Sequence, residues 1–109
     1  MDGMRITLSG SNLTDHRRAY CEYRFFTSVA HHAAIIRRID ITLKRTAEAN
    51  PRVQCAVVVD LGVSGRVKTQ ARSPHPTGAI DRAAQRAAWL LDRRTKATPF
   101  MMKSSRFTL

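Results

Sequence analysis

Acidic residues are scarce in this sequence of 109 residues, where 8 Asp and Glu stand against 19 Lys and Arg and give a formal net charge of +11. A small domain with that excess of one sign repels itself and attracts polyanions. The partners that this favours are nucleic acid first and an anionic membrane surface second. Most of the basic residues are Arg, whose planar fork of donors pairs with phosphate and stacks on bases, so RNA or DNA is favoured over lipid.

Cysteine and long apolar runs are scarce as well. Cys21 and Cys55 lie in apolar surroundings without CxxC spacing, which predicts two buried free thiols rather than a disulfide or a metal pair. No apolar run approaches the roughly 20 residues that a membrane span needs. The first residues, "MDGMRITLSG", lack a basic region followed by an apolar one, so no signal peptide is expected and the cytoplasm is the expected location.

No catalytic or metal-binding set stands out. His31 and His32 are neighbours, so on a helix they point about 100° apart and cannot chelate one metal as an i, i+4 pair would. Ser64 in "GVSG" lies between two strand patterns, which is not the strand-to-helix turn of a hydrolase nucleophile. The acidic residues are scattered singly. We therefore expect neither an enzyme nor a cofactor, metal or small-molecule substrate.

The residues that are present predict one α+β domain. Apolar residues make up 43% of the chain, and their alternation predicts strands over residues 4–9, 37–45, 52–60 and 66–72. Helical spacing predicts helices over residues 15–32 and from Pro76 to about residue 94. The order β-α-β-β-β-α favours a four-stranded mixed sheet with both helices packed on one face, the first two strands parallel and the last two in a hairpin. Residues 1–96 form the predicted domain, and residues 97–109, with Pro99, the predicted flexible tail.

The two helices differ in how clearly they show a buried side. In the second helix, a stripe of mostly small residues recurs at helical spacing: Ile80, Ala83, Ala84, Ala87 and Leu91. In the first helix the periodicity leaves two candidate stripes, one through Cys21, Phe25 and Val29 and another through Ala19, Tyr23, Phe26 and Ala30.

A stripe of arginines on the second helix is the most informative feature. Arg82, Arg86, Trp89 and Arg93 share one helix face, and only Asp81 and Asp92 oppose the positive charge nearby. The stripe is either a solvated face or an RNA-binding face, and Trp89 either stacks on a base or packs against the first helix. With the basic residues of the first helix beside it, such a face would match RNA phosphates. The predicted RNA-binding residues are Arg18, Arg24, Lys68, Arg82, Arg86, Trp89, Arg93, Arg94 and Lys96.

Several segments resemble a known family. "GAIDRAAQRAAWLLDRR" is similar to the last helix of the ribosome hibernation promoting factors, also called ribosome-associated inhibitor or sigma-54 modulation proteins. "ITLSGSN", "RAYCEYR" and "RRIDITL" resemble the first strand, first helix and second strand of that family, and the resemblance covers roughly residues 4–96 in the same element order. It implies the β-α-β-β-β-α fold and binding to rRNA of the small ribosomal subunit, in the channel used by messenger and transfer RNA.

The resemblance also carries implications for single residues. It implies rRNA contacts at Arg24, Arg86 and Arg93, and it favours Cys21, Phe25 and Val29 as the buried stripe, with Tyr23 and Phe26 more exposed. Trp89 departs from the family pattern at a commonly basic position, Gly78 stands where Ala is usual, and Arg17 at a usually apolar position. The sequence has no dimerisation domain of the long form, so we expect the short form, monomeric off the ribosome and without ribosome pairing through that domain.

Two alternatives follow from the same residues. The chain could be a generic double-stranded-RNA-binding module, which also combines a sheet with basic helices. It could also be a regulator that binds another protein through the tail or the exposed aromatic residues.

Overall fold

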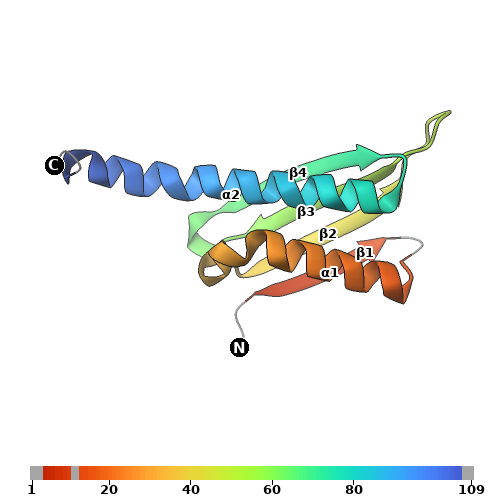
Figure 1. Cartoon of the computed structure of the whole chain (residues 1–109), viewed down its shortest axis with the longest axis horizontal. Coiled ribbons are helices and arrows are strands. Elements are labelled where there is room, and N and C mark those ends of the chain that lie inside the picture. Colours follow the sequence, from red (N-terminus) through yellow and green to blue (C-terminus); the bar gives the residue numbers. More distant parts are fainter. Residues whose placement is uncertain (1–3, 11–12, 107–109) are drawn as a thin grey trace.

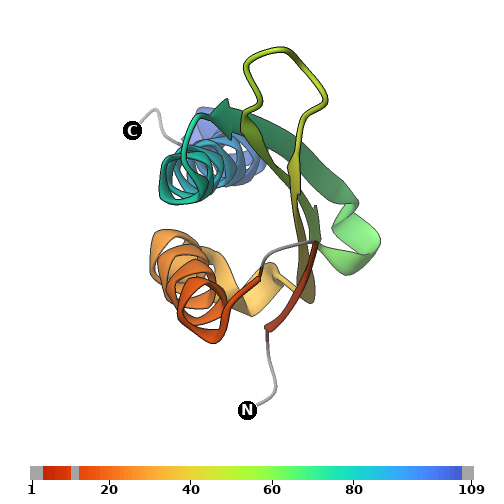
Figure 2. The same ribbon diagram turned by 90° about the vertical axis from the view of Figure 1, so that its right-hand side faces the viewer.

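The protein forms one four-stranded sheet with two helices on one of its faces, in a computed structural model that describes residues 4–10 and 13–106, and side chains as far as residue 95 (Figures 1 and 2). Both helices cover the same side of the sheet, as the order of elements predicted. The elements in chain order are β1 (Arg5–Gly10), α1 (Asp15–Val29), the 3₁₀ helix η1 (Ala30–Ile35), β2 (Arg38–Arg45), β3 (Val53–Asp60), the 3₁₀ turn η2 (Gly62–Ser64), β4 (Arg66–Ser73) and α2 (Pro76–Arg106).

The strands lie side by side in their sequence order. β1 pairs with β2 in parallel, because α1 carries the chain back across the sheet, and β2–β3 and β3–β4 are antiparallel. This confirms the predicted α+β fold and its mixed sheet. It also makes β1 and β4 the two edge strands.

The core lies between the helices and the covered face of the sheet. Cys21, Phe25 and Val29 are fully buried, whereas Tyr23 and Phe26 are 65% and 52% exposed, so the stripe favoured by the family resemblance is the correct one. The predicted stripe of α2 is fully buried as well. Its alanines let α2 lie close on β3 and β4, which fixes the direction in which its remaining side chains point.

Helix α1 begins where the sequence predicted but ends earlier. Thr14 caps its start by accepting a hydrogen bond from the backbone N–H of Arg17 at 3.1 Å. The prediction extended this helix to residue 32, but the α-helix ends at Val29 and the chain continues as η1. The tighter 3₁₀ winding turns the chain toward β2 and brings His32 beside α2.

Helix α2 is longer than predicted. It begins at Pro76, as expected, and continues to Arg106 through Pro99, past the end of the sheet (Figure 1). A helix that is already formed adds residues at little cost, and the chain there offers the good helix formers Lys96, Ala97, Met101 and Met102. The assignment of residues 97–109 as a flexible tail, and the domain boundary at residue 96, stay predictions.

Candidate nucleic-acid interface

The predicted basic stripe of α2 lies on the side of the helix away from the core. Arg82, Arg86, Trp89 and Arg93 are all exposed, because they are offset by about half a turn from the buried alanines. The small residues that fix α2 on the sheet therefore also fix the direction of this stripe.

Three arginines of α2 reach over to the edge of the sheet. Arg86 Nη1 donates to the backbone carbonyl of Gln70 at 2.6 Å, and Arg82 Nη1 lies 3.5 Å from the carbonyl of Arg72. Arg94 Nη2 donates to the carbonyl of Ser64 in η2, beside Gly65, whose φ of 99° and missing Cβ leave room for the guanidinium. The first two contacts satisfy acceptors of the edge strand β4, and the third satisfies an acceptor of the turn before it. Each guanidinium has five N–H donors, so further donors and the whole positive charge remain.

Lys68 joins this group at the β4 edge. A hollow of about 460 Å³ lies between β4 and α2, with Val67 and Leu90 as its apolar walls. Its four other lining residues are all basic: Arg66, Lys68, Arg93 and Arg94. We call this the β4-edge hollow. Lys68 comes from a strand and the two arginines from a helix 25 or more residues later, so the fold brings predicted site residues from two elements together.

Trp89 stays in solvent. Its ring is 55% exposed, and the Arg93 guanidinium carbon lies 4.8 Å from the ring centroid, within range of a cation–π contact. This arrangement removes the interpretation in which Trp89 is buried against α1. Stacking of an RNA base on the ring stays a prediction.

Both acidic residues near the arginine stripe, Asp81 and Asp92, lie on the side of α2 that faces α1 and η1. We call this contact between the helices the seam. Asp81 accepts hydrogen bonds from the Tyr20 hydroxyl at 2.5 Å and from Arg24 Nε at 3.1 Å, and the first of these raises the pKa of the Tyr20 hydroxyl above its ordinary value. Asp92 lies 2.7 Å from His32 Nε2. Both acidic residues are thus engaged in the seam. The arginines of α2 that form no ion pair among the described residues lie on the surface of its β4 side: Arg82, Arg86, Arg93 and Arg94.

The other predicted RNA-binding residues are not all part of that surface. Arg24 lies in the seam, with its charge balanced by Asp81. Arg18 is exposed on the side of α1 shared with Glu22 and Phe26, which faces β1 rather than α2. The side chain of Lys96 lies outside the described residues. RNA contacts stay predictions for all nine residues, and Arg18 and Arg24 do not line the β4-edge hollow.

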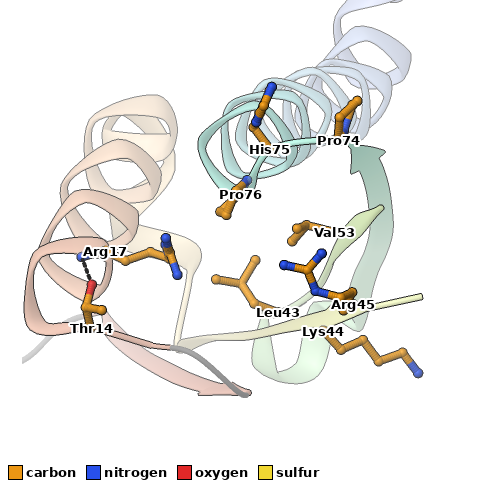
Figure 3. Close-up of a pocket in the computed structure, with 9 residues that line it drawn as sticks. All are labelled: Thr14, Arg17, Leu43, Lys44, Arg45, Val53, Pro74, His75 and Pro76. Carbon is orange, nitrogen blue, oxygen red and sulfur yellow. Dashed lines mark hydrogen bonds between the residues drawn. The ribbon is translucent and has the colours of Figure 1, made fainter. Parts of the chain in front are cut away.

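Sequence reasoning missed a hollow at the opposite end of the molecule, where both helices begin (Figure 3). It has a volume of about 450 Å³, and the guanidinium groups of Arg17 and Arg45 point into it from α1 and β2. His75 and Pro76, at the start of α2, form another wall. No periodicity of a single element indicates this convergence, because the two arginines come from different elements.

A third hollow, of about 510 Å³, lies between α1 and the edge strand β1. Ile6 of β1 and Met4 just before it line one side, and α1 lines the other with one acidic and three apolar residues: Glu22, Ala19, Tyr23 and Phe26. The exposed aromatic rings of α1 therefore border an apolar groove next to an unpaired strand edge.

Three other features of the described residues are the capacity to hold a metal, the state of the two cysteines and the apolar character of the helices. No group of three or more His, Cys, Asp or Glu side chains there is arranged to hold a metal ion. Cys21 and Cys55 are buried and unbonded to each other, as predicted, and burial raises the pKa of each thiol to about 12. Within the same part of the chain, none of the helices has the length and apolar character that crossing a membrane requires.

Comparison with known proteins gives matches among solved structures. No protein-family model matches the sequence, and no curated protein sequence matches it. A ribosomal subunit interface protein from Coxiella burnetii matches with a TM-score of 0.74 at 16% identity, over 84% of this chain and 98% of that one. The N-terminal domain of Thermus thermophilus Protein Y matches with a TM-score of 0.65 at 23% identity, over 85% of this chain and 98% of that one. The chain therefore has the fold of these two proteins, which confirms the fold that the resemblance of its sequence implied.

Proposed function

We propose that the protein is a non-catalytic ribosome hibernation factor of the short form, which binds rRNA of the small ribosomal subunit and occludes the channel for messenger and transfer RNA. The observation that carries this proposal is the β4-edge hollow together with the stripe of α2. The lining of that hollow is basic or apolar throughout, on a fold shared with a ribosomal subunit interface protein.

The chemistry of this surface suits RNA backbone. Arginine and lysine neutralise phosphates and release bound counterions, which gives affinity without reading sequence. Trp89, exposed and flanked by Arg93, offers a π-face to an unstacked base. The proposed inhibition needs no reaction, because a protein that fills the channel excludes messenger and transfer RNA by volume.

The test is co-sedimentation of the protein with purified small subunits over a range of salt concentrations. The variant Arg86→Glu/Arg93→Glu is expected to lose binding, while Arg45→Glu/Arg52→Glu, with the same charge change at the other end of the molecule, is expected to keep most of it. Because Arg86 also donates to Gln70, the single variant Arg93→Glu is included, since its side chain has no such bond to the sheet edge. Far-ultraviolet circular dichroism checks the fold of each variant. Undiminished binding by both Arg93 variants would contradict the assignment.

A generic RNA-binding module is separated from this proposal by competition. A ribosome-directed factor keeps its place on small subunits when free RNA duplex is added in excess, whereas a generic binder moves to the duplex.

The apolar groove between α1 and β1 favours one second candidate, a regulator that binds another protein. An extended peptide could add to the open edge of β1 and place apolar side chains between Met4, Ile6, Tyr23 and Phe26. Such complexes would form without ribosomes and survive high salt, in contrast to RNA binding.

A further inference from the structure

The charged residues on the face of the sheet that the helices leave uncovered are mostly basic. Side chains alternate along each strand, so every second residue of β1, β2 and β4 points to this face and is exposed. The basic residues there are Arg5, Arg38, Lys44, Arg66, Lys68 and Arg72. Asp40 and Asp60 are the carboxylates among the residues that share this alternation.

These carboxylates are already engaged. Asp40 accepts from Arg38 Nε at 3.2 Å, and Asp60 accepts from the backbone N–H of Gly62 at 2.9 Å. Glu48, from the loop before β3, pairs with Arg72 at 3.2 Å. Among the described residues, Arg5, Arg66 and Lys68 form no ion pair, although Asp60 lies opposite Arg66 in the strand register.

The strand register lines these residues up at one end of the sheet. Arg5 pairs with Arg38, Arg38 with Asp60, and Asp60 with Arg66, so the four form one row across all four strands. Neighbouring strands are about 4.8 Å apart, and Lys68 lies about 7 Å further along β4 on the same face. The row therefore places three arginines and one aspartate across the width of the sheet, so that positive charge exceeds negative charge along it.

Each end of this row opens into a hollow. At the β1 end, a hollow of about 740 Å³ adds Arg37 to Arg5 and Arg38. Asp60 is the one carboxylate among the described residues of its lining, and Met4 and Ile36 belong to its apolar wall. At the β4 end, Arg66 and Lys68 line the β4-edge hollow with Arg93 and Arg94. We name Arg5, Arg37, Arg38, Arg66 and Lys68 the sheet-end belt, which continues the surface of α2 around the edge of β4.

We propose that the sheet-end belt binds a second stretch of RNA backbone, so that RNA contacts the domain on both faces at once. The inference rests on the proposed function and extends it, because a domain held inside a channel has RNA on more than one side. Among the described residues of the four strands, none on the uncovered face is aromatic, whereas sheets that read bases stack them on aromatic rings. The belt therefore binds phosphates and does not select sequence.

A purely solvated face is the competing interpretation. Such faces usually mix charges of both signs, which keeps a protein soluble without self-repulsion. Here four cations of the belt form no ion pair among the described residues, and the parallel register places like charges, Arg5 and Arg38, beside each other on neighbouring strands, where their repulsion costs stability. A polyanion offsets that cost.

The test compares two triple variants that lose the same charge. Arg5→Gln/Arg66→Gln/Lys68→Gln removes three of the four belt cations that form no ion pair among the described residues, and Lys44→Gln/Arg45→Gln/Arg52→Gln removes three exposed cations from the far end of the sheet and its hairpin. No hydrogen bond from these six side chains is recorded among the described residues, so both variants are expected to fold. Binding of each to small subunits is measured between 0.05 and 0.2 M salt (roughly the range over which such contacts are lost), with wild type and Arg93→Glu beside them.

Each phosphate contact adds roughly 0.7 to 0.9 to the slope of log affinity against log salt. The belt variant is therefore expected to lower that slope by about 2 to 3 and the affinity at least about tenfold, while the control variant stays near wild type. If the belt variant keeps the slope of wild type, the proposal that the belt binds RNA is wrong, and the proposed function is unaffected. If wild type does not bind small subunits, the proposed function fails. The same variants are then titrated with a free structured RNA, and the same difference in slope tests whether the belt binds RNA backbone.

Discussion

Single arginines of α2 combine a structural role with the proposed role in binding RNA. Arg86 donates one N–H to the carbonyl of Gln70 at the open edge of β4 and keeps its other donors and its charge outside. Lysine has no planar fork and could not divide its donors in this way. The prevalence of Arg over Lys in this chain thus has a reason in the folded protein as well as in RNA recognition.

Two buried thiols make stability depend on alkaline pH. Cys21 and Cys55 are fully buried, and desolvation raises the pKa of each to about 12 from an ordinary value of 9.0. Between those values the unfolded chain loses protons that the folded chain keeps, so the free energy of unfolding is undiminished below pH 9 and falls as pH rises above it. The expected loss approaches about 1.4 kcal/mol per pH unit for each thiol.

Urea unfolding of wild type and of Cys21→Ala/Cys55→Ala at pH 8, 9 and 10 measures this dependence. The double variant starts less stable, because it leaves small cavities, but its stability should fall less between pH 9 and 10. Equal falls in both proteins would contradict the role of the thiols.

At the scale of elements, periodicity predicted most of the fold. Alternation in "RVKTQAR" correctly divided Val67 and Ala71 from Arg66 and Lys68, because a strand exposes one face and buries the other. The stripe of small residues likewise predicted how α2 lies on the sheet. The change to 3₁₀ winding at Ala30 and the length of α2 were not predictable in the same way, since tertiary contacts and helix propagation decide them.

The sequence predicted those features of the site that lie within a single helix or strand, and it did not predict contacts between elements. The arginine stripe follows from helical spacing, and Lys68 follows from alternation. The ion pair of Arg24 with Asp81 joins residues 57 positions apart, and the row through Arg5, Arg38 and Arg66 needs the strand register. Neither leaves a local pattern in the sequence.

The seam between the helices gives a prediction at this scale. Asp81→Ala leaves the Tyr20 hydroxyl and Arg24 without their shared acceptor and should lower the free energy of unfolding by about 1 to 3 kcal/mol. Asp81→Asn keeps an oxygen acceptor and should cost less, about 1 kcal/mol. Because it also removes the charge that neutralises Arg24, it should strengthen binding to RNA. Urea melts and filter binding to small subunits measure the two effects, and weaker RNA binding by a folded Asp81→Asn protein would contradict them.

The whole molecule is a thin slab with positive charge on two sides. The helices cover one face of the sheet, the other face is open, and the β4 edge joins the surface of α2 to the sheet-end belt (Figure 2). Fold and charge together favour insertion between RNA segments over adhesion to a single flat surface.

The most direct test of this account is directed hydroxyl-radical probing from the surface of α2. The native thiols are buried, so an iron chelate tethered to Gln85→Cys, an exposed position of α2 outside the proposed contacts, reports from one point only. The account predicts that, in the complex with small subunits, cleavage is confined to rRNA that lines the channel for messenger and transfer RNA, and that prior filling of the channel with messenger and transfer RNA abolishes it. Cleavage of rRNA elsewhere on the subunit, undiminished by a filled channel, would contradict it.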